Sequence, residues 1–227
     1  MSVWLTYSLS DFLLFSPQTY FRLLELYNRA VWPAQLVAVA LGMAVLALLR
    51  RPDLGSGRAI CAILAACWSW VAWAYLHRRY ATINWAADHA AIGFALQAAM
   101  LLAVAALGRP RFRVGADLGG LAGLALLLTG LVLLPLLGPA LGRPWTQVQL
   151  FGLAPDPTAV ATLGVVLLAA RRRHLVLLAV PLLWTGIGAL TLWAMQAAET
   201  WAMIVAGAVA LAVLPWRLAG RQVRAEV

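Results

Sequence analysis

Long apolar segments run through almost the whole sequence, separated only by short polar or basic stretches. About 20 consecutive apolar residues are enough to cross the hydrocarbon core of a bilayer as an α-helix. Continuous apolar blocks of this kind differ from the periodic pattern of an amphipathic helix in a soluble protein. The pattern therefore predicts an all-α fold, a polytopic bundle of transmembrane helices.

Composition excludes a water-soluble fold. Hydrophobic residues make up 64% of the chain and charged residues 11%, and the mean hydropathy is +0.87. A typical soluble domain is about half apolar and a quarter charged. Too few polar groups are present to cover the surface of a soluble protein. We therefore expect a single integral membrane domain over residues 1–227.

Seven segments are predicted to span the membrane. They cover residues 33–49, 59–76, 86–107, 118–141, 157–170, 175–195 and 200–216. The fifth is short and follows the helix-breaking sequence Ala154-Pro155-Asp156-Pro157, so it is also open to interpretation as a re-entrant hairpin. The distribution of basic residues decides between the two interpretations.

All seventeen basic residues are arginine. With seven spans, twelve arginines fall in the loops 50–58, 108–117 and 171–174 and in the C-terminal tail, and the other five fall on the opposite side. Cytoplasmic loops carry the excess of basic residues. A re-entrant fifth segment would reverse this bias. The sequence therefore favours seven spans, with the N-terminus outside and the C-terminus in the cytoplasm.

Residues 1–32 form an N-terminal segment that is predicted to lie at the outer surface and to contain an amphipathic helix. Ser16 fits the N-cap position, Pro17 the first helical position, and Phe15 is placed to pack against Tyr20. Glu25 and Arg29 have the favourable i,i+4 spacing. We expect this helix on the membrane surface, with packing over the ends of the other helices as the alternative.

Polar residues gather at the predicted outer end, whereas ionisable side chains are almost absent at mid-depth. The candidate site residues there are Glu25, Arg29, His77, Arg78, Arg79, Asn84, Asp88, His89, Asp156 and Glu199. Because a functional membrane protein usually carries its polar residues at its site, we expect any site to face outward.

Two interpretations of this outer group remain open. His77, Asp88 and His89 are weak candidates for a metal site, or the two histidines for a haem axial pair. The simpler interpretation is that Asp88 stabilises a helix N-terminus, where a negative charge is favoured. Likewise, Arg78, Arg79 and Arg143 either bind an anionic ligand or reach lipid phosphates and pair with acidic residues. We expect no metal and no other cofactor.

Several function classes are excluded or disfavoured. A retinal pump needs a Schiff-base lysine, and the chain contains no lysine. Neither a GxSxG nor an HExxH motif is present, so we expect no enzyme. The formal net charge of +9 is explained by arginines that anchor loops, so we expect no nucleic-acid partner.

Three strings carry a resemblance to a known family: LSDFLLFSPQTYFRLLELYNRAVWPAQ at 9–35, RRYATINWAADHA at 78–90 and LFGLAPDPTAVATLG at 150–164. Together they resemble a family of bacterial integral membrane proteins known only as domain of unknown function sixty sixty-four. The resemblance implies a single-domain protein of the bacterial inner membrane. It implies no activity.

Two function hypotheses follow. The first is a non-enzymatic accessory or structural subunit that engages membrane lipids, a membrane-protein partner or a second copy of itself through its outer face. The second is a small transporter or channel for a metal ion or small solute, entered through the outer polar group. A continuous polar path through the bundle would favour transport, and a sealed Leu/Ala/Gly core would favour the subunit.

Overall fold

The computed structural model describes residues 15–169 and 171–219. Its α-helices are α1 (Pro17–Ala30), α2 (Ala34–Leu48), α3 (Leu54–Trp70), α4 (Ala87–Leu107), α5 (Leu118–Leu128), α6 (Leu134–Ala140), α7 (Pro155–Leu167), α8 (Ala179–Ala194) and α9 (Glu199–Ala219). A π-helical segment, Val71–His77, continues α3, and another, Thr129–Leu133, joins α5 to α6. A 3-10 segment, Arg172–Leu178, precedes α8. Short 3-10 turns occupy Tyr80–Thr82 and Trp145–Gln147.

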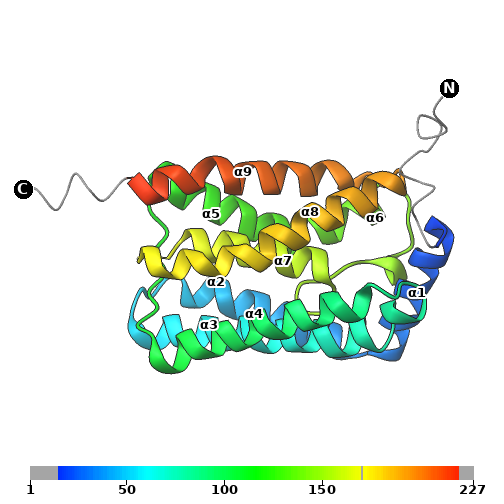
Figure 1. Ribbon diagram of the computed structural model, residues 1–227, viewed down its shortest axis with the longest axis horizontal. Helices are drawn as coiled ribbons and strands as arrows, with labels where there is room; N and C mark the ends of the chain where they lie inside the picture. Colours follow the sequence, from blue (N-terminus) through cyan, green and yellow to red (C-terminus); the bar gives the residue numbers. More distant parts are fainter. Residues whose placement is uncertain (1–14, 170, 220–227) are drawn as a thin grey trace, which may run out of the picture.

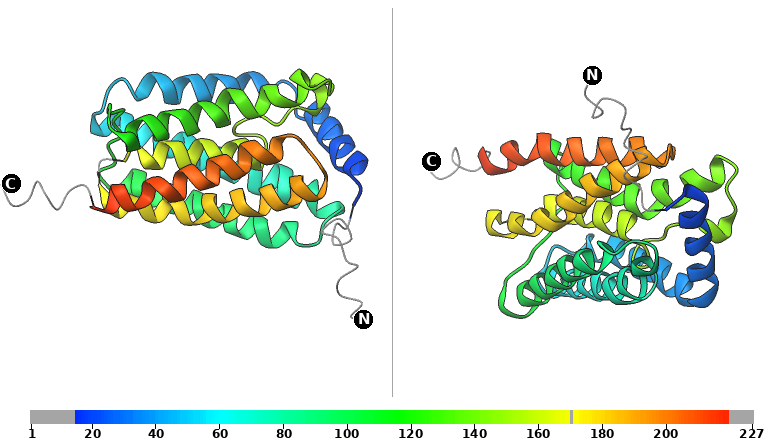
Figure 2. Two further views of the ribbon diagram at one scale, coloured as in Figure 1. Left: turned by 90° about the horizontal axis from the view of Figure 1, so that it is seen from above. Right: turned by 45° about the vertical axis from the view of Figure 1, so that its right-hand side comes forward.

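Helices α2 to α9 run along a common axis, and the chain passes from end to end of the bundle in alternating directions (Figure 1). Helices α2, α3 and α4 form one side, and α5, α8 and α9 form the other, with α7 between them (Figures 1 and 2). The all-α fold class predicted from the sequence is thus confirmed for the described part of the chain. All seven predicted apolar segments are helical, with boundaries that shift by a few residues.

The predicted number of seven spans is not confirmed. Five helical units are long and apolar enough to cross a membrane: Leu54–Thr82, Ala87–Leu107, Leu118–Ala140, Arg172–Ala194 and Glu199–Arg217. A sixth is added if α1 and α2, which meet at 90°, count as one broken span. Helix α7 has 13 residues. At 1.5 Å per residue this is about 20 Å, shorter than the roughly 30 Å of a bilayer core.

Helix α7 is the buried centre of the bundle. Every one of its residues from Pro155 to Leu167 is buried, and α3, α5, α8 and α9 pack around it. Its few polar side chains are bonded internally: Trp68 Nε1 donates to Thr162 Oγ1 at 2.9 Å, and that hydroxyl donates to the Thr158 carbonyl at 2.7 Å. A helix hydrophobic on all sides is expected at such a position.

Glycines allow α5 and α7 to touch backbone to backbone. A Cβ on Gly164 would lie 2.3 Å from the backbone nitrogen of Leu127 and 2.6 Å from the carbonyl oxygen of Gly123. A Cβ on Gly130 would lie 2.6 Å from the carbonyl oxygen of Pro157. Small residues permit this close approach where lipid supplies no hydrophobic drive between helices. Gly123 and Gly130 on one side and Gly164 on the other therefore form the contact between α5, the π-helical segment after it and α7.

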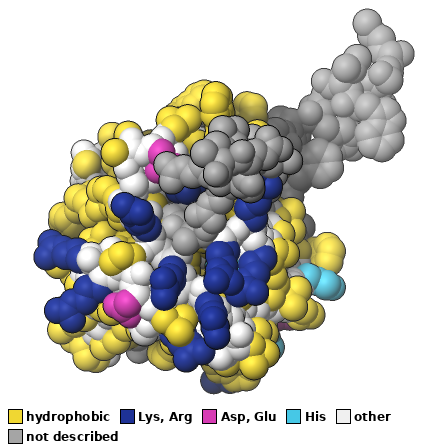
Figure 3. Space-filling view, turned by 90° about the vertical axis from the view of Figure 1, so that its left-hand side faces the viewer, with side chains coloured by type: hydrophobic (Ala, Val, Ile, Leu, Met, Phe, Trp, Pro, Cys, Tyr) yellow, Lys and Arg dark blue, Asp and Glu magenta, His cyan; other side chains and the backbone are white. Residues whose placement is uncertain are grey.

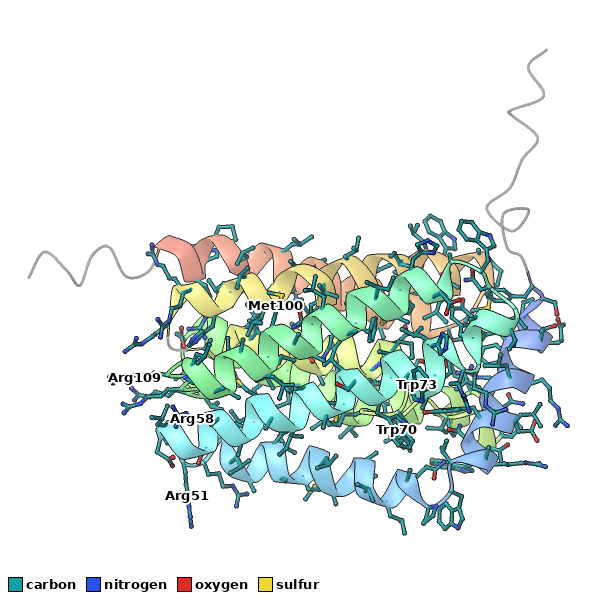
Figure 4. The ribbon with its side chains drawn as sticks, turned by 60° about the horizontal axis from the view of Figure 1, so that its bottom comes forward. Arg51, Arg58, Trp70, Trp73, Met100 and Arg109 are labelled. Atoms are coloured by element: carbon teal, nitrogen blue, oxygen red, sulfur yellow. The ribbon has the colours of Figure 1, made fainter. Side chains whose placement is uncertain are left out.

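One end of the bundle is rich in arginine, as the space-filling view of that end shows (Figure 3). Arg51, Arg58 and Arg109 lie there, whereas Trp70 and Trp73 lie nearer the opposite end (Figure 4). The Arg113 N–H donates to the Leu168 carbonyl at 3.0 Å, which brings the 108–117 loop beside the end of α7. We call this the arginine end and the opposite one the α1 end. Which of them faces the cytoplasm stays a prediction.

Helix α1 lies across the other end of the bundle (Figures 1 and 2). Ser16 caps it by accepting from the Thr19 N–H at 3.2 Å, Pro17 begins it, and Phe15 stacks on Tyr20 with ring centroids 6.0 Å apart. These three local predictions are confirmed. Its apolar face is buried against the other helices, so the packing alternative describes α1 better than a helix lying free on the membrane surface.

Replacing Gly164 by alanine is expected to destabilise the fold. The added methyl meets the α5 backbone, and overpacking of this kind costs about 1–3 kcal/mol. Gly186→Ala is the matched control, because a Cβ there meets nothing within 4 Å. Thermal unfolding in detergent should give a lower melting temperature for Gly164→Ala and an unchanged or higher one for Gly186→Ala. Equal melting temperatures would contradict the tight α5–α7 contact.

Candidate functional site

A buried non-helical segment leads into α7. Residues 148–154 return from the α1 end into the bundle, and Phe151 and Leu153 are 3% and 5% exposed. Non-helical backbone at membrane depth is tolerated only where the rest of the protein covers it or where it lines a water-filled cavity. Helix α7 therefore begins inside the bundle rather than at its surface.

Helix α1 supplies hydrogen bonds that hold the 148–154 segment and the turn before it. Tyr27 Oη donates to the Leu153 carbonyl at 3.0 Å and accepts from Trp70 Nε1 at 2.9 Å. Asn28 Nδ2 donates to the carbonyls of Thr146 and Val148 at 2.9 and 2.8 Å. An unpaired carbonyl at this depth would be costly, so these bonds account for the position of α1.

A tight turn completes the entrance to α7. Gly152 has φ +79°, a backbone conformation that favours glycine, and a Cβ there would lie 2.9 Å from Cys67 Sγ. Its N–H donates to Thr158 Oγ1 at 2.8 Å, and that hydroxyl donates to the Ala154 carbonyl at 2.7 Å. The turn fixes where the first residues of α7 lie.

Asp156 lies in the first turn of α7 and is 4% exposed. Its Oδ1 accepts from Trp184 Nε1 at 2.9 Å. Gly188 makes room for the carboxylate, since a Cβ there would lie 2.9 Å from the same oxygen. A negative charge is favoured at a helix N-terminus. Within the described part of the chain, no arginine or histidine forms an ion pair with Asp156.

Asp156 faces a cavity of about 380 Å³ between the end of α3, α4 and α8, here named the Asp156 cavity. Five aromatic side chains line it: Tyr20, Tyr75, Tyr80, Phe94 and Trp184. Tyr75 Oη is buried and has no hydrogen-bond partner among the described residues. A concave, mainly apolar cavity with a few convergent polar groups is the usual form of a small-molecule site.

The cavity opens sideways, between α4 and α8. Leu183 and Ile187 on α8 line it and are 66% and 44% exposed. Ala86 at the N-cap of α4 and His89 within this helix are exposed, and Gly93 is half-buried deeper along it. These side chains lie on the flank of the bundle, which is the surface that apolar spans turn toward lipid. The cavity is therefore reached from the side of the bundle.

Comparison with known families identifies the chain. A family model described as a family of unknown function (DUF6064) matches residues 17–225. The chain belongs to the DUF6064 family. No curated protein and no solved structure matches it. The resemblance seen in the sequence is thus confirmed, and the matched region of this DUF6064 protein includes every residue that lines the Asp156 cavity.

The structure separates the predicted site residues of this DUF6064 protein into groups. Asn84, His89 and Asp156 line the cavity. His77 Nδ1 and Asp88 Oδ1 lie 2.8 Å apart on the exposed surface, and His77 stacks on Trp73. Within residues 15–169 and 171–219, no three His, Cys, Asp or Glu side chains are grouped to hold a metal ion.

Three further predicted site residues, Glu25, Arg29 and Glu199, form ion pairs. Glu25 forms ion pairs with Arg22 at 3.1 Å and Arg29 at 2.6 Å, and the Arg22 hydrogen bond lowers the pKa of the glutamate. Arg143 pairs with the buried Glu199, and burial lowers the pKa of the arginine.

Two further predicted cations lie apart from Arg143. Arg78 and Arg79 both line a groove beside α1, and Arg78 also lies over the ring of Trp73. Arg143 does not line this groove and pairs with Glu199, so the three arginines predicted as an anion site do not all converge.

Sequence reasoning missed the tyrosines and Trp184 as parts of one site. The sequence predicts Tyr20 only as the packing partner of Phe15, and Trp184 lies in the middle of the apolar 175–195 segment with no charged neighbour to mark it. One feature of the sequence could have indicated the site: the helix-breaking sequence at 154–157, which precedes an unusually short apolar segment. In a membrane protein, an interrupted helix often lines a binding site.

Replacing Tyr27 by phenylalanine is expected to loosen α1 and the 148–154 segment. The change leaves the buried Leu153 carbonyl without its donor, which costs about 1–3 kcal/mol. Tyr75→Phe is the matched control, because its hydroxyl has no partner among the described residues. Hydrogen exchange of residues 148–154 should accelerate in Tyr27→Phe alone. Equal exchange in both variants would contradict this role of Tyr27.

Proposed function

We propose that this DUF6064 protein is a non-enzymatic accessory protein of the bacterial inner membrane that binds a small amphiphilic ligand in the Asp156 cavity. The observation that carries the proposal is a buried carboxylate, without a basic partner among the described residues, facing an aromatic cavity that opens on the flank of the bundle. Its walls are mainly apolar and its polar groups few, which suits a ligand with one polar head.

Binding is favoured over catalysis by what the cavity contains. Its ionisable lining groups are one carboxylate, one imidazole and three tyrosine hydroxyls. Among the described residues its lining contains no serine or cysteine, and the hydroxyl of Thr191 donates to the Ile187 carbonyl of its own helix. A hydroxyl nucleophile is usually activated by an adjacent base, and the described lining residues form no such pair. A site with these groups holds and orients a ligand.

Binding is also favoured over transport. Beyond Asp156, α7 is buried along its length, and Val160, Leu163 and Leu167 are 0% exposed. Large apolar side chains such as Leu64 and Leu127 fill the same core. A polar solute would need a hydrated path through this packed region, and packed apolar cores have few voids larger than water. A sealed core supports the accessory protein.

The orientation follows from the arginine end. Basic residues are retained on the cytoplasmic side, so we propose that the arginine end faces the cytoplasm and the α1 end faces outward. The exposed arginines of the ion-paired stripe on α1, Arg22 and Arg29, then face the outer aqueous phase. This stripe is the proposed contact for a membrane-protein partner or a second copy of the chain, with lipids around the flanks.

Filling the cavity is expected to abolish ligand binding. Gly93 lines the cavity and a Cβ there meets nothing within 4 Å, so Gly93→Phe should occupy the space without disturbing the fold. Gly186→Phe is the control, because Gly186 is equally open but lies outside the cavity.

The measurement is native mass spectrometry of the protein in nanodiscs with a mixture of dodecylamine, dodecanol and dodecanoic acid. Wild type and Gly186→Phe should retain a bound amphiphile that Gly93→Phe lacks. The same occupancy in all three proteins would refute the proposed binding site.

A further inference from the structure

We infer that the ligand of the Asp156 cavity is an amphiphile with a cationic amino head group, held by Asp156 while its alkyl chain leaves between α4 and α8 into the bilayer. This inference rests on the proposed function and names the chemical class of its ligand. It is argued from the charge, the aromatic walls and the opening of the cavity.

The charge of Asp156 is the first argument. A buried carboxylate is costly unless its charge is paired, and the partners of Asp156 are neutral: Trp184 Nε1 donates to it at 2.9 Å, and the buried Gln149 side chain is its second neighbour. The N-terminus of α7 favours the ionised form but carries no full positive charge. In a site of low dielectric constant, a ligand cation interacts with the carboxylate far more strongly than in water. Asp156 is therefore suited to bind a cationic group of the ligand.

The aromatic walls are the second argument. Tyr20, Tyr75 and Tyr80 form one cluster, with ring centroids 6.0 Å apart for Tyr20 and Tyr80 and 5.9 Å apart for Tyr75 and Tyr80. Phe94 and Trp184 meet edge to face at 5.0 Å on the other side. Aromatic faces attract cations through the ring quadrupole. The same faces, with Asp156, disfavour an anionic head.

The hydroxyl of Tyr75 is the third argument. It is buried, lines the cavity and has no partner among the described residues. A hydroxyl oxygen can accept a hydrogen bond, and a primary ammonium has three N–H donors. One of these donors can bond Asp156 while another bonds Tyr75. Because buried polar groups are usually hydrogen-bonded, we expect the polar head of the ligand to lie next to this hydroxyl.

The size and opening of the cavity define the rest of the ligand. A volume of about 380 Å³ is near the lower limit for small-molecule sites, so the cavity holds a head group and only part of a chain. Leu183, Ile187 and Gly93 form an apolar path toward the flank. The basic group that lines the cavity, His89, lies exposed at the α1 end of this path.

The test compares head groups on one chain length. Wild-type protein in nanodiscs of neutral phosphatidylcholine is titrated at pH 8 with dodecylamine, dodecyltrimethylammonium, dodecanol and dodecanoate, and occupancy is read by native mass spectrometry. An alkylamine is protonated at this pH, like lysine. We expect the affinity for dodecylamine to be at least about 10-fold higher than that for dodecanol, because loss of one buried charge contact changes affinity by at least this much. Dodecanoate should bind most weakly.

Asp156→Asn should weaken dodecylamine binding about 10-fold or more and leave dodecanol binding nearly unchanged. The matched control is Asp88→Asn, which removes an exposed carboxylate outside the cavity and should leave both affinities unchanged. Tyr75→Phe should weaken binding of the primary amine dodecylamine. It should leave binding of dodecyltrimethylammonium unchanged, because that compound has no N–H to donate.

The outcomes separate the two proposals. If Gly93→Phe abolishes binding but wild type binds dodecanol or dodecanoate as tightly as dodecylamine, the cationic class is wrong and the proposed binding site stands. If no amphiphile binds, or Gly93→Phe makes no difference, the proposed site fails. Should Asp156→Asn not fold, the head-group preference of the wild type and the Tyr75→Phe comparison still decide the question.

Discussion

The structure depends on the complete burial of α7. Because other helices surround α7, the 148–154 segment that leads into it is buried too, and its backbone carbonyls must be bonded inside the protein. Tyr27 and Asn28 of α1 donate to the carbonyls of Leu153 and Val148. Glycines on α5 and α7 bring the two backbones together, and Trp68 bonds the α7 hydroxyl of Thr162. Because α7 begins at mid-bundle, its first turn carries Asp156 to a depth that no surface loop would reach.

The same arrangement explains why the site lies toward the α1 end. Helix α7 divides the bundle into the α2–α4 and α5–α9 sides, and below its first turn the two sides are sealed by apolar side chains. At that turn, residues of α4 and α8 line the Asp156 cavity. Helix α1 then covers the end of the bundle while the flank stays open. Binding from the bilayer is the function that these constraints support.

Much of the fold was predictable because hydropathy in a membrane chain is a strong signal. The seven apolar segments, the Ser16 cap and the Phe15–Tyr20 contact follow from residues a few positions apart. The count of seven spans is not confirmed, because hydropathy does not distinguish a short core helix such as α7 from a short transmembrane helix. Asn84, His89 and Asp156 were predicted as outer-face site residues and do line the cavity, but its aromatic walls were missed because Tyr20, Tyr75 and Trp184 come from three separate segments. Contacts between distant segments leave no periodic pattern in a single sequence.

The central claim is that the first turn of α7 faces an open cavity inside an otherwise sealed bundle. Cysteine accessibility tests it most directly, because the native Cys61 and Cys67 are buried. A cysteine at Asp156 should react with methanethiosulfonate ethylammonium, and Gly93→Phe should block that reaction, whereas a cysteine at Val160, one turn deeper and 0% exposed, should stay unmodified. An unreactive cysteine at 156, or equal labelling at 156 and 160, would contradict this account of the site.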